Sequence, residues 1–164
     1  MIDSHATAAR WGANQTILVA GLAAALLEIL PALIVQGALG VSPLLLFQSI
    51  SSGLLGQAAY SGGIASALLG AAIHLFISLV AAGIFVFASR LWPVLTVRYV
   101  FAGLFYGALV YAVMNYVVLP LSAIAFKPTS ALPLVATSFA VHLVFFGLPI
   151  SLVTRLAAAR RRFS

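Results

Sequence analysis

Charged residues are scarce in this sequence. Only 6% of the 164 residues are charged, whereas 64% are hydrophobic. A soluble domain carries roughly a quarter charged residues, so this chain lacks the polar side chains that cover a water-facing surface. The composition therefore predicts one integral membrane domain whose main partner is a lipid bilayer.

Cysteine is absent, and so are the common catalytic motifs. The lack of cysteine excludes disulfide bonds, thiolate metal sites and cysteine nucleophiles. The sequence also contains no GxSxG or SxxK motif, no aspartate inside an apolar run and no glycine-rich phosphate loop. These absences predict that the chain is not an enzyme.

Acidic residues are rarer than basic ones, which gives a net charge of +6. The basic residues stand at the ends of apolar runs and form no patch with interleaved aromatic residues, so we predict no nucleic-acid partner. We interpret them as markers of membrane topology, and the positive-inside rule then predicts that both termini are cytoplasmic. The cytoplasmic side would hold Arg10, Arg90, Arg98, Arg155, Arg160, Arg161 and Arg162, and the opposite side only Lys127.

Four apolar runs are long enough to cross a bilayer, which takes about 20 residues. They cover residues 16–39, 63–89, 99–121 and 132–152. The expected fold is all-α, an integral membrane four-helix bundle that occupies residues 15–156. Residues 1–14 would form a cytoplasmic N-terminal tail, and residues 157–164 a basic cytoplasmic tail.

A further short helix is expected at about residues 43–57, between the first and second spans. Ser42 followed by Pro43 is typical of a helix N-terminus. Apolar residues then recur at helical spacing, while glutamine and serine residues gather on another side. The segment is too short and too polar to span the bilayer, so it would form an interfacial helix or a re-entrant one.

Four polar residues interrupt the spans: Glu28, His74, His142 and Asn115. A bilayer core penalises ionisable groups, so these residues are candidates for a functional site. At 1.5 Å per residue, Glu28 lies about 18 Å into its span and each histidine about 15 Å from the opposite entrance. The three ionisable groups are therefore expected near the midplane of a core about 30 Å thick, with Asn115 nearer the periplasmic end.

Small residues accompany three of these polar groups. Glu28 shares a helix face with Gly21, and His74 shares one with Gly70, while Asn115 follows a GxxxG sequence at residues 103–107. Because helices in lipid pack through small residues, we expect these polar groups at helix contacts rather than facing lipid. The same faces could instead join two copies of the chain into a homo-oligomer.

Three functions suit this polar cluster. A glutamate beside histidines can exchange protons near neutral pH, so the first hypothesis is a transporter-like or channel-like protein that handles protons or a small polar solute. The second is a membrane redox protein in which His74 and His142 ligate a haem b. The third is a structural or accessory subunit whose polar groups only organise helix contacts. The spacing of a metal motif such as HExxH is absent, so no metal site is predicted.

Four segments of the chain carry a resemblance to known proteins: YGALVYAVMNYVVLPLSA at 106–123, HLVFFGLPISL at 142–152, EILP at 28–31 and SPLLLFQSISSGLLG at 42–56. In these segments the chain resembles a family of uncharacterised bacterial inner-membrane proteins with four spans. The resemblance extends over nearly the whole chain and implies a multi-pass protein of the bacterial inner membrane. It implies no activity or functional residue, because none is assigned to that family.

Overall fold

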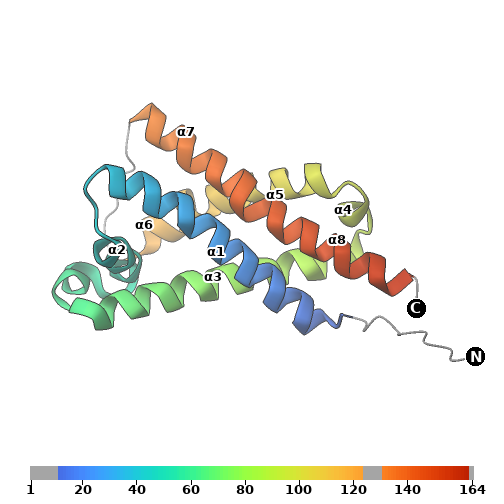
Figure 1. Ribbon diagram of the computed structural model, residues 1–164, viewed down its shortest axis with the longest axis horizontal. Helices are drawn as coiled ribbons and strands as arrows, with labels where there is room; N and C mark the ends of the chain where they lie inside the picture. Colours follow the sequence, from blue (N-terminus) through green and yellow to red (C-terminus); the bar gives the residue numbers. More distant parts are fainter. Residues whose placement is uncertain (1–10, 124–130, 163–164) are drawn as a thin grey trace, which may run out of the picture.

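Four long helices make up most of the protein (Figure 1). The computed structural model describes residues 11–123 and 131–162, and it contains no strand within them. All four helices are long and apolar enough to cross a membrane, so the predicted all-α four-helix fold is confirmed. The first two long helices are α1 (Ala13–Ala38) and α3 (Gly63–Leu91). The third helix consists of α5 (Tyr99–Val113), η2 (Met114–Val118) and α6 (Leu119–Leu121). The fourth helix consists of α7 (Leu132–Val141), η3 (His142–Gly147) and α8 (Leu148–Arg162).

The observed boundaries lie close to the predicted ones except at the C-terminus. The fourth helix runs on from residue 152, its expected end, to Arg162, so most of the predicted basic tail continues α8. A single turn, α4 (Val94–Val97), was not predicted and links α3 to α5. Arg10 and Lys127, which entered the topology prediction, lie outside the described residues.

Helix α1 occupies the middle of the bundle. It packs against α3 on one side and against η3 and α8 on the other, and the third helix packs against η3 and α8. The start of α1, the end of α8 and α4 lie at the same end of the bundle in Figure 1. We call this the arginine end, because Arg90, Arg98 and Arg155 belong to it.

The predicted short helix between the first two spans is present as α2 (Pro43–Leu55), followed by a 3₁₀ turn, η1 (Gly56–Ser61). The Ser42 hydroxyl accepts a hydrogen bond from the Leu45 amide, as expected of an N-cap. The polar side of α2 packs against α3, because the Gln48 side-chain amide donates to the Gly63 carbonyl at 3.0 Å and lies 3.3 Å from the Ser66 hydroxyl. Leucines occupy its outward side: Leu44, Leu45, Leu54 and Leu55 are exposed.

Glycines bring the third and fourth helices into backbone contact. A Cβ atom built on Gly107 would overlap the His142 carbonyl, and one on Gly147 would overlap the Gly103 carbonyl. Since no side chain larger than hydrogen fits there, these glycines set the distance between the two helices. The GxxxG sequence that could have joined two copies of the chain is therefore buried within one copy.

Two helices contain π turns, which the sequence patterns did not predict. The turns are η2 (Met114–Val118) and η3 (His142–Gly147), and each ends shortly before a proline, Pro120 or Pro149. A proline ring clashes with the carbonyl four residues earlier, which here lies inside the π turn, and a wider turn relieves that clash. Pro31, by contrast, sits within the continuous α-helix α1.

Candidate functional site

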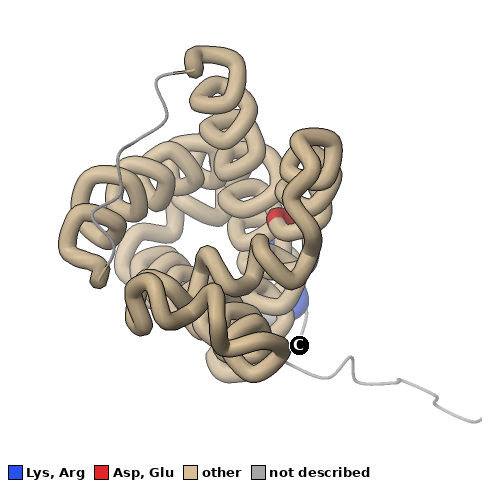
Figure 2. The backbone as a smooth tube through the Cα atoms, turned by 90° about the vertical axis from the view of Figure 1, so that its left-hand side faces the viewer, with Lys and Arg blue, Asp and Glu red and all other residues tan. Residues whose placement is uncertain are grey.

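Glu28 lies between the two histidines of the long helices. Its Oε2 atom is 3.5 Å from Nε2 of His74 on α3, and its Oε1 atom is 4.0 Å from Nε2 of His142 in η3. The side chains are about 15% exposed, so all three are largely shielded. Glu28 is the one acidic residue among those the structure describes (red in Figure 2). We call these three residues the Glu–His cluster.

A backbone carbonyl fixes the tautomer of each histidine. Nδ1 of His142 lies 2.9 Å from the Ser138 carbonyl, and Nε2 of His74 lies 3.0 Å from the Ala25 carbonyl. A carbonyl oxygen can only accept, so each of these nitrogens carries a hydrogen. Neutral His142 therefore presents the lone pair of Nε2 to Glu28, whereas His74 presents an N–H group.

This arrangement places two acceptors, the Glu28 carboxylate and Nε2 of neutral His142, 4.0 Å apart. His74 donates to the Ala25 carbonyl, and its Nε2 atom also lies 3.5 Å from Oε2 of Glu28.

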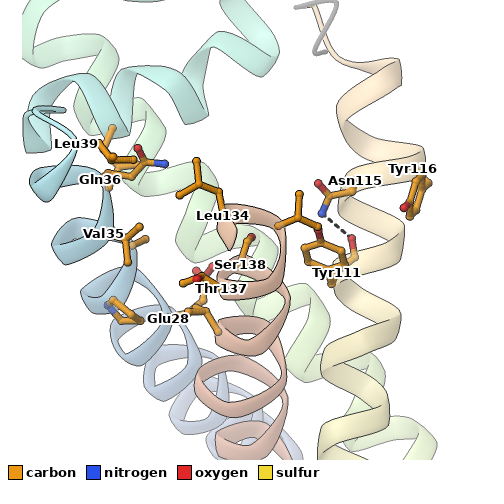
Figure 3. A pocket seen from close by; sticks show the side chains of 15 residues that line it. Glu28, Val35, Gln36, Leu39, Tyr111, Asn115, Tyr116, Leu134, Thr137 and Ser138 are labelled. Atoms are coloured by element: carbon orange, nitrogen blue, oxygen red, sulfur yellow. Dashed lines mark hydrogen bonds between the residues drawn. The ribbon is translucent and has the colours of Figure 1, made fainter. Parts of the chain in front are cut away.

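A pocket of about 570 Å³ opens beside Glu28 on the side away from the arginine end. Its wall is built by the C-terminal half of α1, the start of α7, the third helix near η2, and Leu46 of α2 (Figure 3). Most lining side chains are apolar. The polar ones are Glu28, Gln36, Tyr111, Asn115, Tyr116, Thr137 and Ser138.

Asn115 lines this pocket but does not contact the Glu–His cluster. Its side-chain amide donates to the Tyr111 carbonyl at 2.9 Å, one turn earlier on the same helix (Figure 3). Tyr111 connects the two regions, because its ring stands edge-on to that of His142 with centroids 5.2 Å apart. Tyr111 was not predicted as a site residue, although it lies one helical turn before Asn115 and so on the same helix face.

The bundle is closed on the other side of the cluster. A core of small and aromatic residues fills the space toward the arginine end, and all of them are buried: Ala20, Ala24, Ala81, Ala82, Phe85, Tyr106, Phe146 and Ile150. The buried hydroxyls of Ser78, Ser151 and Thr154 donate to carbonyls of their own helices. They therefore form no hydrogen-bonded chain leading away from the cluster, and we call this part the closed half.

The geometry does not fit a haem held by His74 and His142. Both Nε2 atoms, which would have to face the iron, point at the carboxylate of Glu28 instead. Nε2 of His74 is also committed to the Ala25 carbonyl. Among the residues described, no group of three or more histidine, cysteine or acidic side chains is arranged to hold a metal ion.

Comparisons with protein-family models, with curated proteins and with solved structures find no match to this chain. The family resemblance drawn from the sequence therefore stays a prediction. What the protein does has to be inferred from the cluster and its pocket.

Proposed function

We propose that this is a membrane protein that binds a small polar solute in the pocket and couples binding to the protonation of Glu28. The observation that carries the proposal is the position of Glu28, which faces the pocket on one side and two imidazoles on the other. A solute in the pocket would meet the carboxyl group of Glu28, which would share a proton with Nε2 of His142 in the proposed function. The proposed role is binding, with no catalytic step.

The proposed location is the bacterial inner membrane with both termini in the cytoplasm. The arginine end would then be cytoplasmic and the pocket would open toward the periplasmic side. Helix α2 would lie within the apolar zone or at its edge, because its outward leucines need an apolar setting while its polar side is satisfied by α3.

The closed half limits how the protein would work. An open proton channel is disfavoured, because the hydroxyls beyond the cluster donate to their own helices rather than to one another. Transport would require the closed half to open after binding, as in alternating access. Without that change the protein would act as a receptor or accessory subunit that responds to the solute.

Infrared spectroscopy of the protein in lipid would test the proton-linked role. The chain has two acidic side chains, Glu28 and Asp3, so a band of a protonated carboxyl group is easily assigned. We expect a band that disappears in Glu28→Gln, persists in the matched control Asp3→Asn, and changes reversibly with pH. Substituting His142→Gln should move the midpoint of that change, whereas His5→Gln should not.

A Glu28 band that stays constant over the whole pH range in which the protein is folded would contradict the proposal. The glutamate would then only organise helix contacts, which is the structural alternative raised by the sequence.

A further inference from the structure

We infer that the solute is a small organic cation with an apolar body, a protonated amine, which competes with the shared proton for Glu28. This inference rests on the proposed function and adds the chemical class of the ligand. Its basis is the charge, the hydrogen-bonding groups and the size of the pocket.

Among the residues that the structure describes, the pocket is lined by one carboxyl group and by no cationic side chain. None of its 15 lining residues is lysine, arginine or histidine, and Glu28 is the only one with a carboxylate. An anion would meet this carboxylate with no compensating positive charge in the wall. A cation would meet an opposite charge in a partly shielded site, where attraction is stronger than in water.

The hydrogen-bonding groups of the wall also favour a donor ligand. The Thr137 hydroxyl donates to the Pro133 carbonyl at 2.8 Å, and the Asn115 side-chain amide donates to the Tyr111 carbonyl. The Thr137 hydroxyl hydrogen and one of the two amide hydrogens of Asn115 are thus engaged by the backbone, and the oxygen atoms of both side chains remain as acceptors. An ammonium group has three donors and no acceptor, which complements these two oxygen atoms.

The remaining wall suits an apolar body. It includes Val35, Leu39, Leu46 and Leu134, and its volume of about 570 Å³ lies in the range that holds small organic molecules. Glu28 lies toward the inner end of the α1 segment that lines the pocket, because the lining residues of α1 run from residue 28 to residue 39. An amine would therefore place its charged end inward and its apolar part toward the mouth.

Competition with a proton follows from the cluster. The titratable groups that face Glu28 are His74 from α3 and His142 from η3, and Tyr111 of α5 lies beside His142. A cation at the carboxylate would disfavour a second positive charge on the neighbouring imidazole. One cation would bind as one proton leaves to water, so the net charge of the site stays constant.

Isothermal titration calorimetry of the full-length protein in a non-ionic detergent tests this inference. The probes are phenethylammonium, the neutral phenethyl alcohol and the anionic phenylacetate, which share an aromatic body. We expect the cation to bind at least about tenfold more tightly than either analogue, a difference that one well-placed charge interaction supplies. Titrations in two buffers with different heats of ionisation should report release of about one proton per cation.

The pH dependence and two variants sharpen the test. While the shared proton is bound, linkage predicts that the affinity for the cation rises by about tenfold per pH unit. Glu28→Gln should abolish the preference for the cation, while the matched control Asp3→Asn keeps it. Ala32→Leu, which narrows the pocket without changing its charge, should weaken binding of the cation and leave the infrared band of Glu28 in place.

Equal binding of the three probes, tighter binding of phenylacetate, or no binding of any probe would overturn the inference. If the infrared band of Glu28 still responds to pH in those cases, the proton-linked function stands and only the ligand class is wrong. A band that does not respond to pH removes the proposed function, whichever probe binds.

Discussion

The two halves of the bundle differ in how their helices meet. In the closed half, alanines and glycines let the backbones approach, and the buried hydroxyls of Ser78, Ser151 and Thr154 are satisfied by their own helices. In the half beyond the Glu–His cluster, the pocket lies between α1, α7 and the third helix, and polar side chains face it. The same four helices thus make a packed core at one end and a binding site at the other.

A structural polar group differs from a candidate functional one in where its partners lie. Ser151 and Thr154 are buried and polar, yet each donates to a carbonyl in its own helix and needs no other partner. Glu28 has no such local partner and depends on side chains from two other helices. Burial and polarity are common to both halves, whereas Glu28 combines dependence on side chains of two other helices with access to a cavity.

The largest expected effect comes from filling a glycine contact in the closed half. Gly147→Ala would place a methyl group against the backbone of Gly103 and Gly107, so we expect a loss of about 3 kcal/mol of stability. Gly83→Ala is the matched control, because a Cβ atom there meets only Ile17 at 4.0 Å. Thermal unfolding in detergent would measure both, and equal stability of the two variants would contradict the packing described for the closed half.

The next effect is expected at the boundary between the halves. Glu28→Gln keeps the shape of the side chain but removes the charge that faces two histidines, so we expect a loss of about 2 kcal/mol at neutral pH. Thermal unfolding in detergent would measure the loss, and unchanged stability of Glu28→Gln would contradict the contacts described for the cluster.

A smaller effect is expected for a buried hydrogen bond inside the closed half. The Tyr106 hydroxyl donates to the Ala81 carbonyl at 2.7 Å and joins the third helix to α3. Tyr106→Phe keeps the ring and its contact with Phe85, so the expected loss is about 1 kcal/mol. Chemical unfolding would measure it, and a loss as large as that of Gly147→Ala would mean that this bond, rather than helix proximity, holds the half together.

The smallest effect on stability is expected in the pocket wall. Asn115 makes a single hydrogen bond to its own helix, so Asn115→Leu should change stability by no more than about 0.5 kcal/mol. The same variant should weaken binding of phenethylammonium, because it removes an acceptor from the wall. A large loss of stability with unchanged binding would place Asn115 among the structural groups instead.

The positions of the spans and of the Glu–His cluster could be predicted because both follow from simple counting. Apolar run length locates the spans, and a rise of 1.5 Å per residue sets the depths of Glu28, His74 and His142. The pocket could not be predicted in this way, because it depends on how far α7 and the third helix stand from α1. The π turns were also missed, although Pro120 and Pro149 are visible signals for them.

The short helix α2 shows another limit of sequence patterns. A helix with an apolar and a polar side suggests that the polar side faces water. Here Gln48, Ser51 and Ser52 are buried and the leucines face outward. The pattern predicted the helix correctly but not which of its two sides is buried. The buried side of α2 is determined by its packing against glycine and serine residues of α3.

The central claim is that His142 and Glu28 share one proton while His74 remains a fixed donor. Nitrogen NMR of protein labelled only at histidine tests it directly, since the chain has three histidines and His5 can be identified by the His5→Gln variant. We expect neutral His142 to carry its hydrogen on Nδ1 and His74 to carry its hydrogen on Nε2, with only the His142 signal strongly altered by Glu28→Gln. A His142 hydrogen on Nε2, or no response of His142 to Glu28→Gln, would contradict the account.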